Sequence, residues 1–473
     1  MVFSSPIFLF YFLPVVLLAY YLLRKHIVLQ NLILFVSSLL FYFWGEKEHS
    51  ILVLISILIN YNVGLLLSKQ GTQTAQKITL ATGIILNLSI LLYFKYYNFF
   101  INDFLTYFNL ATPLEESGKI HLPLGISFFT FHGITYITDI YRREAQVSKN
   151  LLNVSLYTLF FPQLIAGPIV RYTDISQQLV KREIKNSQVN SGIKRFIIGL
   201  AKKIIIANSL GRIVDAIYTL EIAHLSPALI WFGIAVFALQ LYYDFSGYSD
   251  MAIGLARMTG FEFKENFNFP FAARSLTDLW TRWHISLTTF FRNYVYIPLG
   301  GNKKGAARTY SNLLFVFFLT GLWHGPSWNC ILWGLVTGFF LVMEKLFLRK
   351  WIEKLPYFLA NIYTLLLFII ALMIFKIDCG EHLADVLSKA FFIHTASTQI
   401  YFPSFYLTTD LYFILFVAIV FSYPVHQSKV YLALHQRISR IPYLNDLMYI
   451  SLLLLTVCIM SSSTYNPFIY FKF

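Results

Sequence analysis

A histidine in apolar surroundings is the first candidate for chemistry in this sequence. In "NLLFVFFLTGLWHGPSWNC", His324 follows an apolar run of helix length and stands between Trp323 and Gly325, with Asn329 close behind. No carboxylate lies nearby in the sequence to explain the imidazole as a member of an ion pair. A neutral imidazole in a low-dielectric cavity can take a proton from an alcohol or phenol that attacks a carbonyl. We therefore predict that His324 is a general base, with a hydrogen-bonded structural histidine as the alternative.

A second polar group lies in "SLTDLWTRWHISLTTFFRNYVYIPLGGNKKG". This segment carries Arg282, His284 and Arg292 ahead of a basic, glycine-rich turn that contains Lys303 and Lys304. Guanidinium groups bind phosphate oxygens in pairs, and glycine allows close approach of the backbone. The four cations are predicted to bind a phosphate-bearing ligand at the membrane surface. A basic cytoplasmic loop would give the same pattern, so that alternative stays open.

Two carboxylates interrupt the otherwise membrane-like segment "QLYYDFSGYSDMAIGL". They are Asp244 and Asp250, and carboxylates this close to lipid need partners. They either cap helix ends or pair with arginines inside the bundle, or they contact the substrate directly. Trp323 and Asn329, beside His324, are further candidates for polar or structural roles at the site.

The chain ends on "PFIYFKF", in which Tyr470 is the single phenol of a terminal hexapeptide that otherwise lacks hydroxyl groups. Aromatic residues are common at the membrane boundary, which favours an interfacial anchor. On the sequence alone, Tyr470 is therefore expected to belong to an anchor at the interface.

Several kinds of chemistry are disfavoured by missing motifs. The sequence contains no Gly-x-Ser-x-Gly elbow, no Walker loop, no His-Glu-x-x-His and no paired-cysteine metal site. We therefore expect no metal ion and no permanently bound cofactor.

The composition is that of an integral membrane protein. The 473 residues are 57% hydrophobic, 18% aromatic and only 13% charged, which is too apolar for a soluble domain. The net charge of +14 suits loops that face anionic lipid or an anionic substrate, and nucleic-acid binding is disfavoured.

Uncharged stretches long enough to cross a bilayer recur along the chain. The first run, Pro6 to Leu23, is expected to be a retained helix rather than a signal peptide. We predict an all-α polytopic protein with about ten to thirteen membrane helices, because lipid-exposed backbone must satisfy its hydrogen bonds internally. The longer stretches are 27–44, 51–68, 78–94, 227–243, 356–375 and 447–471, and the shorter ones are 122–138, 151–170, 311–323, 329–343 and 411–425.

Loop charges predict the orientation. Basic residues follow the first and third helices, whereas the loop near 99–120 is mainly acidic, which puts the N-terminus outside the cell membrane. The basic stretch from Arg171 to Lys203 is expected to be a cytoplasmic interfacial helix, with a binding surface for an anionic cofactor as the alternative. One continuous membrane domain over 1–473 is the simplest organisation.

Further motifs follow one another along the chain in this order: "MVFSSPIFLFYFLP", "LPLGISFFTFHGITYITDIYR", "FPQLIAGPIVRY", "QLYYDFSGYSDMAIGLARMTGF", "NFNFPF", "SLTDLWTRWHISLTTFFRNYVYIPLGGNKKG" and "GLWHGPSWNCILWG". With these motifs in this order, the sequence resembles the membrane-bound O-acyltransferases, and within them the bacterial branch of alginate O-acetylase and the peptidoglycan O-acetylation proteins. The resemblance covers residues 1 to about 345, with weaker signal over 346–473 until the last residues.

The resemblance implies a fold of two funnels that meet at a thin membrane centre, with re-entrant segments. His324 would lie near that centre and be required for acyl transfer, and His284 would lie towards the cytoplasmic side. The donor would be acetyl-CoA, whose phosphates fit the basic loops. The acetyl group would pass to a cell-surface or exported polysaccharide, usually through an extracytoplasmic transferase of the SGNH type.

The terminal "FIYFKF" resembles an aromatic motif of this branch, in which the tyrosine is proposed to carry the acyl group as an ester; here that residue is Tyr470. Transfer of D-alanine to teichoic acid is an alternative, although those relatives keep the motif on a separate peptide. Two other classes remain: a transporter of polysaccharide precursors with a proton relay, and a scaffold for the extracytoplasmic transferase.

Overall fold

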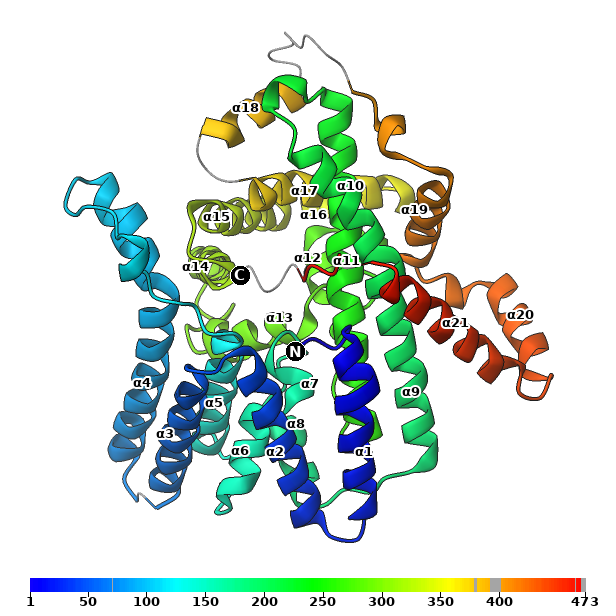
Figure 1. Ribbon diagram of the computed structural model, residues 1–473. Helices are drawn as coiled ribbons and strands as arrows, with labels where there is room; N and C mark the ends of the chain where they lie inside the picture. The colour runs from blue at the N-terminus through cyan, green and yellow to red at the C-terminus, as the bar shows by residue number, and fades with distance from the viewer. Residues whose placement is uncertain (70, 378–380, 392–400, 464, 469–473) are drawn as a thin grey trace. The chain divides into compact units, whose positions relative to one another are not determined.

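The computed structural model describes the chain except for residues 70, 378–380, 392–400, 464 and 469–473 (Figure 1). The described residues form helices joined by turns and loops, with no β-strand among them, so the predicted all-α class is confirmed. The chain divides into two compact units. Unit 1 holds residues 1–196 and 249–265, and unit 2 holds residues 197–248 and 266–473. Whether they form one membrane domain stays a prediction.

Seven helices in the described part of the chain are long and apolar enough to cross a membrane. They are Ile27–Gly45, Ser50–Lys69, Gln73–Leu105, Pro227–Met258, Trp328–Ile352, Tyr357–Lys376 and Leu444–Ser461, and two shorter apolar helices are Phe8–Leu22 and Thr409–Phe421. The predicted stretch 447–471 ends early, at Ser461, because a run of hydroxyl residues follows the apolar helix. A total of ten to thirteen membrane helices stays a prediction.

Unit 1 is built around α5, whose residues from Ile126 to Ile140 are all buried. On α3 and α4, the side-chain amides of Asn60 and Asn87 exchange hydrogen bonds of 3.0 and 2.9 Å. A Cβ at Gly133 of α5 would stand 2.3 Å from the Asn60 amide nitrogen, so glycine allows α5 to pack directly on this pair. The helices of this unit are α1 (Leu13–Leu22), α2 (Ile27–Gly45), α3 (Ser50–Lys69), α4 (Gln73–Phe99), α5 (Ile126–Tyr141), α6 (Leu151–Leu159), α7 (Phe161–Leu164), α8 (Tyr172–Val180) and most of α9 (Asn186–Ala201).

The basic stretch from Arg171 to Lys203 is not one helix. It forms α8 and α9, with non-helical residues 181–185 between them. The helix α11 (Pro227–Met258) also contributes to both units, since Tyr248 is the last of its residues in unit 2.

Unit 2 contains a tight helical hairpin of α14 and α15. A Cβ at Gly321 would stand 2.4 Å from the Cys330 carbonyl oxygen, and a Cβ at Gly334 would stand 2.4 Å from that of Phe317. The two glycines therefore let the helix backbones touch, which fixes the end of α14 against α15 (Figure 1). The other helices are α10 (Asn208–Tyr218), α12 (Leu276–Arg282), α13 (Ile285–Phe291), α14 (Ala306–His324), α15 (Trp328–Met343), α16 (Arg349–Ile352), α17 (Tyr357–Lys376), α18 (Glu381–Ala390), α19 (Thr409–Phe421), α20 (Lys429–Ser439) and α21 (Leu444–Ser461).

Candidate active site

Unit 2 encloses a cavity of about 270 Å³ that contains both predicted histidines. Its wall is mainly aromatic and aliphatic, as expected of a site that holds a ligand away from water. The polar lining residues are His284, Thr288, Arg292, Tyr296, Thr320, His324 and Lys345, and the others are Leu241, Trp280, Trp283, Leu287, Phe291, Leu313, Val316, Phe317, Trp333, Phe368, Leu372 and Phe375.

His324 is the last residue of α14 and is only 8% exposed. Aromatic rings hold its imidazole from several sides. The ring centroid lies 5.0 Å from that of Trp333 and 5.5 Å from that of Phe375, both nearly edge-to-face. This packing restricts the rotamer of the imidazole and shields the ring from water. A neutral imidazole fixed in this way can act as a general base.

His284 occupies a strained turn between α12 and α13. Its backbone is left-handed, with φ of 46°, a conformation that is uncommon for residues with a side chain and is often found at functional sites. Asn266 stabilises the turn: its main-chain oxygen accepts from the Ile285 N–H at 2.9 Å and its side-chain oxygen accepts from the Ser286 hydroxyl at 2.8 Å.

The same amide also shows which ring nitrogen of His284 carries the proton. Nδ1 of His284 lies 3.1 Å from the side-chain oxygen of Asn266, and an amide oxygen can only accept a hydrogen bond. Nδ1 therefore carries the proton of the neutral ring, which leaves Nε2 as the basic nitrogen. Sequence reasoning missed Asn266, which is fully buried; the only sequence signal was its position at the start of "NFNFPF".

Two cations, Arg292 and Lys345, line the cavity towards the end that is remote from the imidazoles. The lining of α14 runs from Leu313 to His324, a length of about 16 Å at 1.5 Å per residue. Because α15 returns antiparallel to α14, Lys345 lies towards the beginning of α14. The segment after Arg292 lies there too, since Asn312 of α14 donates to the Gly301 carbonyl at 3.1 Å.

The predicted phosphate-binding residues thus differ in whether they line the cavity. Arg292 lines the cavity, and Lys303 and Lys304 lie in an exposed turn just before α14. Arg282 does not line the cavity, because its guanidinium group pairs with Asp278 one turn earlier on α12, at 2.7 Å. Lys345, which the sequence analysis did not select, does line it.

The remaining predicted polar residues have partners in the protein. Asp250, in unit 1, pairs with Arg195 at 2.8 Å, and Asn329 donates to the Phe375 carbonyl at 3.0 Å. Asp244, in unit 2, forms a buried ion pair with Lys203 at 2.5 Å. The two carboxylates, six residues apart on α11, therefore belong to different environments.

The Asp244–Lys203 pair also holds the beginning of the C-terminal tail. The Lys203 ammonium group donates to the main-chain carbonyl of Pro467 and lies 5.6 Å from the ring centroid of Phe468. The Phe468 ring in turn lies 4.8 Å from that of Tyr248 on α11. Tyr470 itself lies outside the described residues.

A second phenol near the tail is already engaged. The hydroxyl of Tyr465 donates to Asp215 at 2.5 Å, and burial together with this hydrogen bond raises the pKa of Tyr465 above its ordinary value. Asn208 donates to the Tyr465 carbonyl at 3.1 Å, which fixes the backbone of the same segment. Tyr465 is therefore a structural phenol that holds its proton.

Comparisons with known proteins identify the class to which this helical unit with two imidazoles in one cavity belongs. The family model described as "MBOAT, membrane-bound O-acyltransferase family" matches residues 31–381. The chain belongs to this family and is a multi-pass membrane enzyme of the acyltransferase class.

Three named relatives within this comparison modify alginate, peptidoglycan or teichoic acid, according to their names. "Probable alginate O-acetylase AlgI" of Pseudomonas aeruginosa is 40% identical over 80% of this chain and 72% of that relative. "Peptidoglycan O-acetyltransferase" of Helicobacter pylori is 37% identical over 77% of this chain and 75% of that relative. "Teichoic acid D-alanyltransferase" of Bacillus subtilis is 29% identical over 52% of this chain and 65% of that relative.

Proposed function

We propose that this protein is an O-acetyltransferase that takes acetyl from cytoplasmic acetyl-CoA and passes it across the membrane to a cell-surface or exported polysaccharide. The observation that carries the proposal is the cavity, which has His284 and His324 at one end and cationic side chains towards the other. The alginate- and peptidoglycan-modifying relatives support acetyl as the transferred group and a polysaccharide as the acceptor.

The shape and charge of the cavity support a CoA thioester as the donor. A volume of about 270 Å³ suits an acyl group and the slender arm that carries it, but not the nucleotide of CoA. The nucleotide phosphates would stay outside, near Arg292, Lys345 and the turn with Lys303 and Lys304, where cations can bind them. The thioester would then reach the imidazoles about 16 Å further along α14.

Acyl transfer at the imidazole end needs one base and one nucleophile. In the proposed step, His324 takes the phenolic proton of Tyr470 while the phenol oxygen attacks the thioester carbonyl. The C–S bond breaks, the imidazolium returns the proton to the leaving thiolate, and CoA leaves as the thiol. The acetyl group is then held as a phenyl ester, from which the oxygen of an acceptor hydroxyl takes it in a second transfer that restores the phenol.

The anchored tail supports a place for Tyr470 near this chemistry. Phe468 is held beside Tyr248 and Lys203, and any chain of two residues can span at most about 7 Å. On α11, Phe245 contacts the His284 ring at 4.6 Å between centroids, one residue after the Asp244 that pairs with Lys203. As an acyl carrier, Tyr470 would therefore have to reach only a short distance from the anchored Phe468. An interfacial anchor would not require Phe468 to be held in this way.

The acceptor side involves a partner. We propose an extracytoplasmic acetyltransferase of the SGNH type that receives the acetyl group and places it on the glycan. The loop charges support a cytoplasmic (inner) membrane location with the N-terminus outside. Labelling of single cysteines at Arg24 and Lys119 with a membrane-impermeant reagent tests this: Lys119→Cys should react from outside and Arg24→Cys only after permeabilisation.

Transfer of D-alanine is the second candidate, supported by the Bacillus subtilis relative. The terminal aromatic motif on this chain favours acetyl, because the D-alanine relatives that it resembles keep the motif on a separate peptide. An acyl-transfer assay that supplies D-alanyl carrier protein in place of acetyl-CoA distinguishes the two donors.

Release of CoA from acetyl-CoA by the purified protein tests the proposal. We expect time-dependent release that His324→Ala reduces about 10²–10⁴-fold, the usual contribution of a general base. The exposed His26, remote in sequence from both catalytic candidates, provides the matched control, and His26→Ala should retain full activity. Proton-coupled sugar movement without thioester turnover would indicate a transporter. Glycan acetylation that survives His324→Ala would indicate a scaffold.

A further inference from the structure

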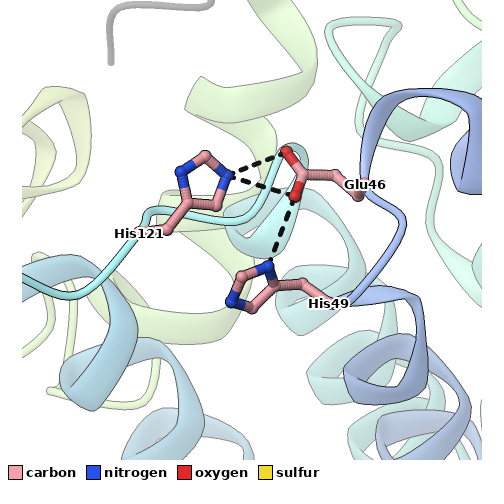
Figure 2. A group of neighbouring side chains, drawn as sticks. All are labelled: Glu46, His49 and His121. Atoms are coloured by element: carbon pink, nitrogen blue, oxygen red, sulfur yellow. Dashed lines mark hydrogen bonds and ion pairs between the residues drawn. The ribbon is translucent and has the colours of Figure 1, made fainter.

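Unit 1 gathers an acidic side chain and two imidazoles that acyl transfer does not use. The carboxylate of Glu46 and the rings of His49 and His121 point towards one another (Figure 2). Nε2 of His121 lies 3.2 Å from one Glu46 oxygen, and Nδ1 of His49 lies 3.7 Å from the same oxygen. One ligand atom from each residue lies within 4.8 Å of the other two.

These residues come from distant parts of the sequence. Glu46 directly follows α2, and His49 directly precedes α3, so both lie in the short turn between two membrane-type helices. His121 is 75 positions from Glu46, in the segment between α4 and α5, shortly after the 3₁₀ helix Glu116–Gly118. The side-chain amide of Asn98, on α4, holds the neighbouring residue Ile120: it donates to the Ile120 carbonyl at 2.7 Å and accepts from the Ile120 N–H at 2.9 Å.

The Glu46 carboxylate lacks a cationic side chain that would explain its burial. Only 4% of the side chain is exposed, and a buried carboxylate requires compensation. Its contacts within the described part of the chain are the two histidines and the main-chain N–H of Leu124 at 3.1 Å, with no lysine or arginine. A metal ion would supply the missing positive charge.

We propose that Glu46, His49 and His121 form a binding site for a divalent transition metal, with Zn²⁺ as its best fit. At bond lengths of about 2.0–2.1 Å, two ligands on a tetrahedral zinc stand about 3.3 Å apart. The 3.2 and 3.7 Å separations bracket that value, so small side-chain shifts would complete the geometry. Imidazole nitrogens and a carboxylate oxygen are the ligands of known two-histidine, one-carboxylate zinc sites.

The exposure of His121 indicates how the site is reached and what it does. The His121 side chain is 61% exposed, which gives an ion access from solvent and leaves room for a water molecule as the fourth ligand. A bound ion would fasten the segment 106–125 to the turn between α2 and α3. The site is thus a metal-dependent clamp on a long surface segment, separate from the acyl-transfer cavity of unit 2 and independent of the proposed function.

No metal was predicted from the sequence, because the sequence lacks contiguous metal-binding motifs and paired cysteines. The new site joins residues across the fold, so spacing along the chain did not reveal it.

Zinc binding by the full-length protein tests the proposal, after removal of any affinity tag and of bound metal by a chelator. Calorimetry should show one Zn²⁺ per chain, and the melting temperature should rise with Zn²⁺, because an ion that binds only the folded state stabilises it. Co²⁺ should give the visible absorption of a tetrahedral site. Limited proteolysis within 106–120 should become slower when Zn²⁺ is present.

His121→Ala is the decisive variant, because its exposed side chain can be removed without leaving a buried cavity. His121→Ala and His49→Ala should each weaken Zn²⁺ binding at least about tenfold, since even the loss of an outer partner costs about 10–100-fold. His26→Ala is the control and should bind as the unchanged protein does. Absence of Zn²⁺ binding, or equal binding by His121→Ala, would overturn the site and leave a carboxylate–histidine cluster without metal.

Discussion

One indole lies against both catalytic candidates: the Trp323 ring centroid is 4.9 Å from that of His324 and 5.8 Å from that of His284. Trp323 and His324 are adjacent at the end of α14, whereas His284 comes from the turn before α13. The indole therefore fixes the spacing of two imidazoles from different elements. A donor in the cavity would meet both rings as one preorganised unit.

Asn266 is expected to be a positioning residue for His284. Asn266→Ala removes the acceptor for Nδ1–H of His284, so the ring can adopt the other tautomer and lose its orientation. We expect kcat for CoA release to fall by about 10–100-fold, by analogy with the loss of groups that orient a functional histidine. The KM for acetyl-CoA should change little.

Asn266→Asp keeps an acceptor oxygen of the same shape beside His284, at the cost of a buried carboxyl group. It should retain more activity than Asn266→Ala if the hydrogen bond is what matters. If Asn266→Ala and Asn266→Asp lost kcat to the same extent and melting temperature to the same extent, Asn266 would have only a structural role.

Arg292 and Lys345 are expected to bind the phosphates of CoA. Arg292→Ala and Lys345→Ala should each raise the KM for acetyl-CoA about tenfold, the loss expected for one charge-assisted contact of about 1.5 kcal/mol. The KM for acetylpantetheine, which lacks the nucleotide phosphates, should be unchanged. The exposed Arg437 on α20 provides the control. A similar rise in KM for both donors would place the two cations elsewhere in the reaction.

Removal of one partner from the ion pair between Lys203 and Asp244 should destabilise unit 2 and release the tail. Lys203→Met leaves Asp244 as a buried charge without its cation, which costs about 3–5 kcal/mol, and it removes the contact to Pro467. We expect a lower melting temperature and loss of tail acetylation. The double variant Lys203→Met/Asp244→Leu should recover stability but not acetylation. Recovery of both would show that the tail contact at Pro467 is dispensable.

The hairpin of α14 and α15 should not tolerate a methyl group at Gly334, where the two helix backbones touch. In Gly334→Ala the new Cβ would stand 2.4 Å from the Phe317 carbonyl oxygen, so the helices must separate and the edge-to-face contact of His324 with Trp333 is disturbed. We expect a destabilisation of about 1–3 kcal/mol, as for overpacked cores, together with loss of activity. Gly71→Ala, at a glycine with open space around it, is the control for thermal unfolding. Wild-type stability in Gly334→Ala would contradict the direct backbone contact.

The sequence predicted the apolar helices well because a bilayer demands a local property, a run of about 20 uncharged residues. The stretches 27–44, 51–68 and 356–375 each lie within or within one residue of a helix in the structure. His324 and His284 could also be selected locally, as polar residues in aromatic surroundings, and the fold does bring them into one cavity. The family motifs strengthened both inferences.

The missed features depend on contacts between distant segments. Asn266 gains its role only because a turn 18 residues later folds back on it, and Lys345 only because α15 returns beside α14. Arg282 looked equivalent to Arg292 in the sequence, but its neighbour Asp278 on the same helix engages it. Charge and spacing show which side chains are available, whereas the partner that engages each one is decided by the fold.

Mass spectrometry of the C-terminal peptide, after incubation of the purified protein with isotope-labelled acetyl-CoA, tests the central claim most directly. We expect labelled acetyl on Tyr470 in the unchanged protein and none on the structural phenol of Tyr465. Tyr470→Phe keeps the ring but should carry no label, and His324→Ala should show little or none. The carrier role of Tyr470 would be wrong if polysaccharide acetylation continued while the terminal peptide never carried label, or if acetylation survived Tyr470→Phe. Tyr470 would then be an interfacial anchor.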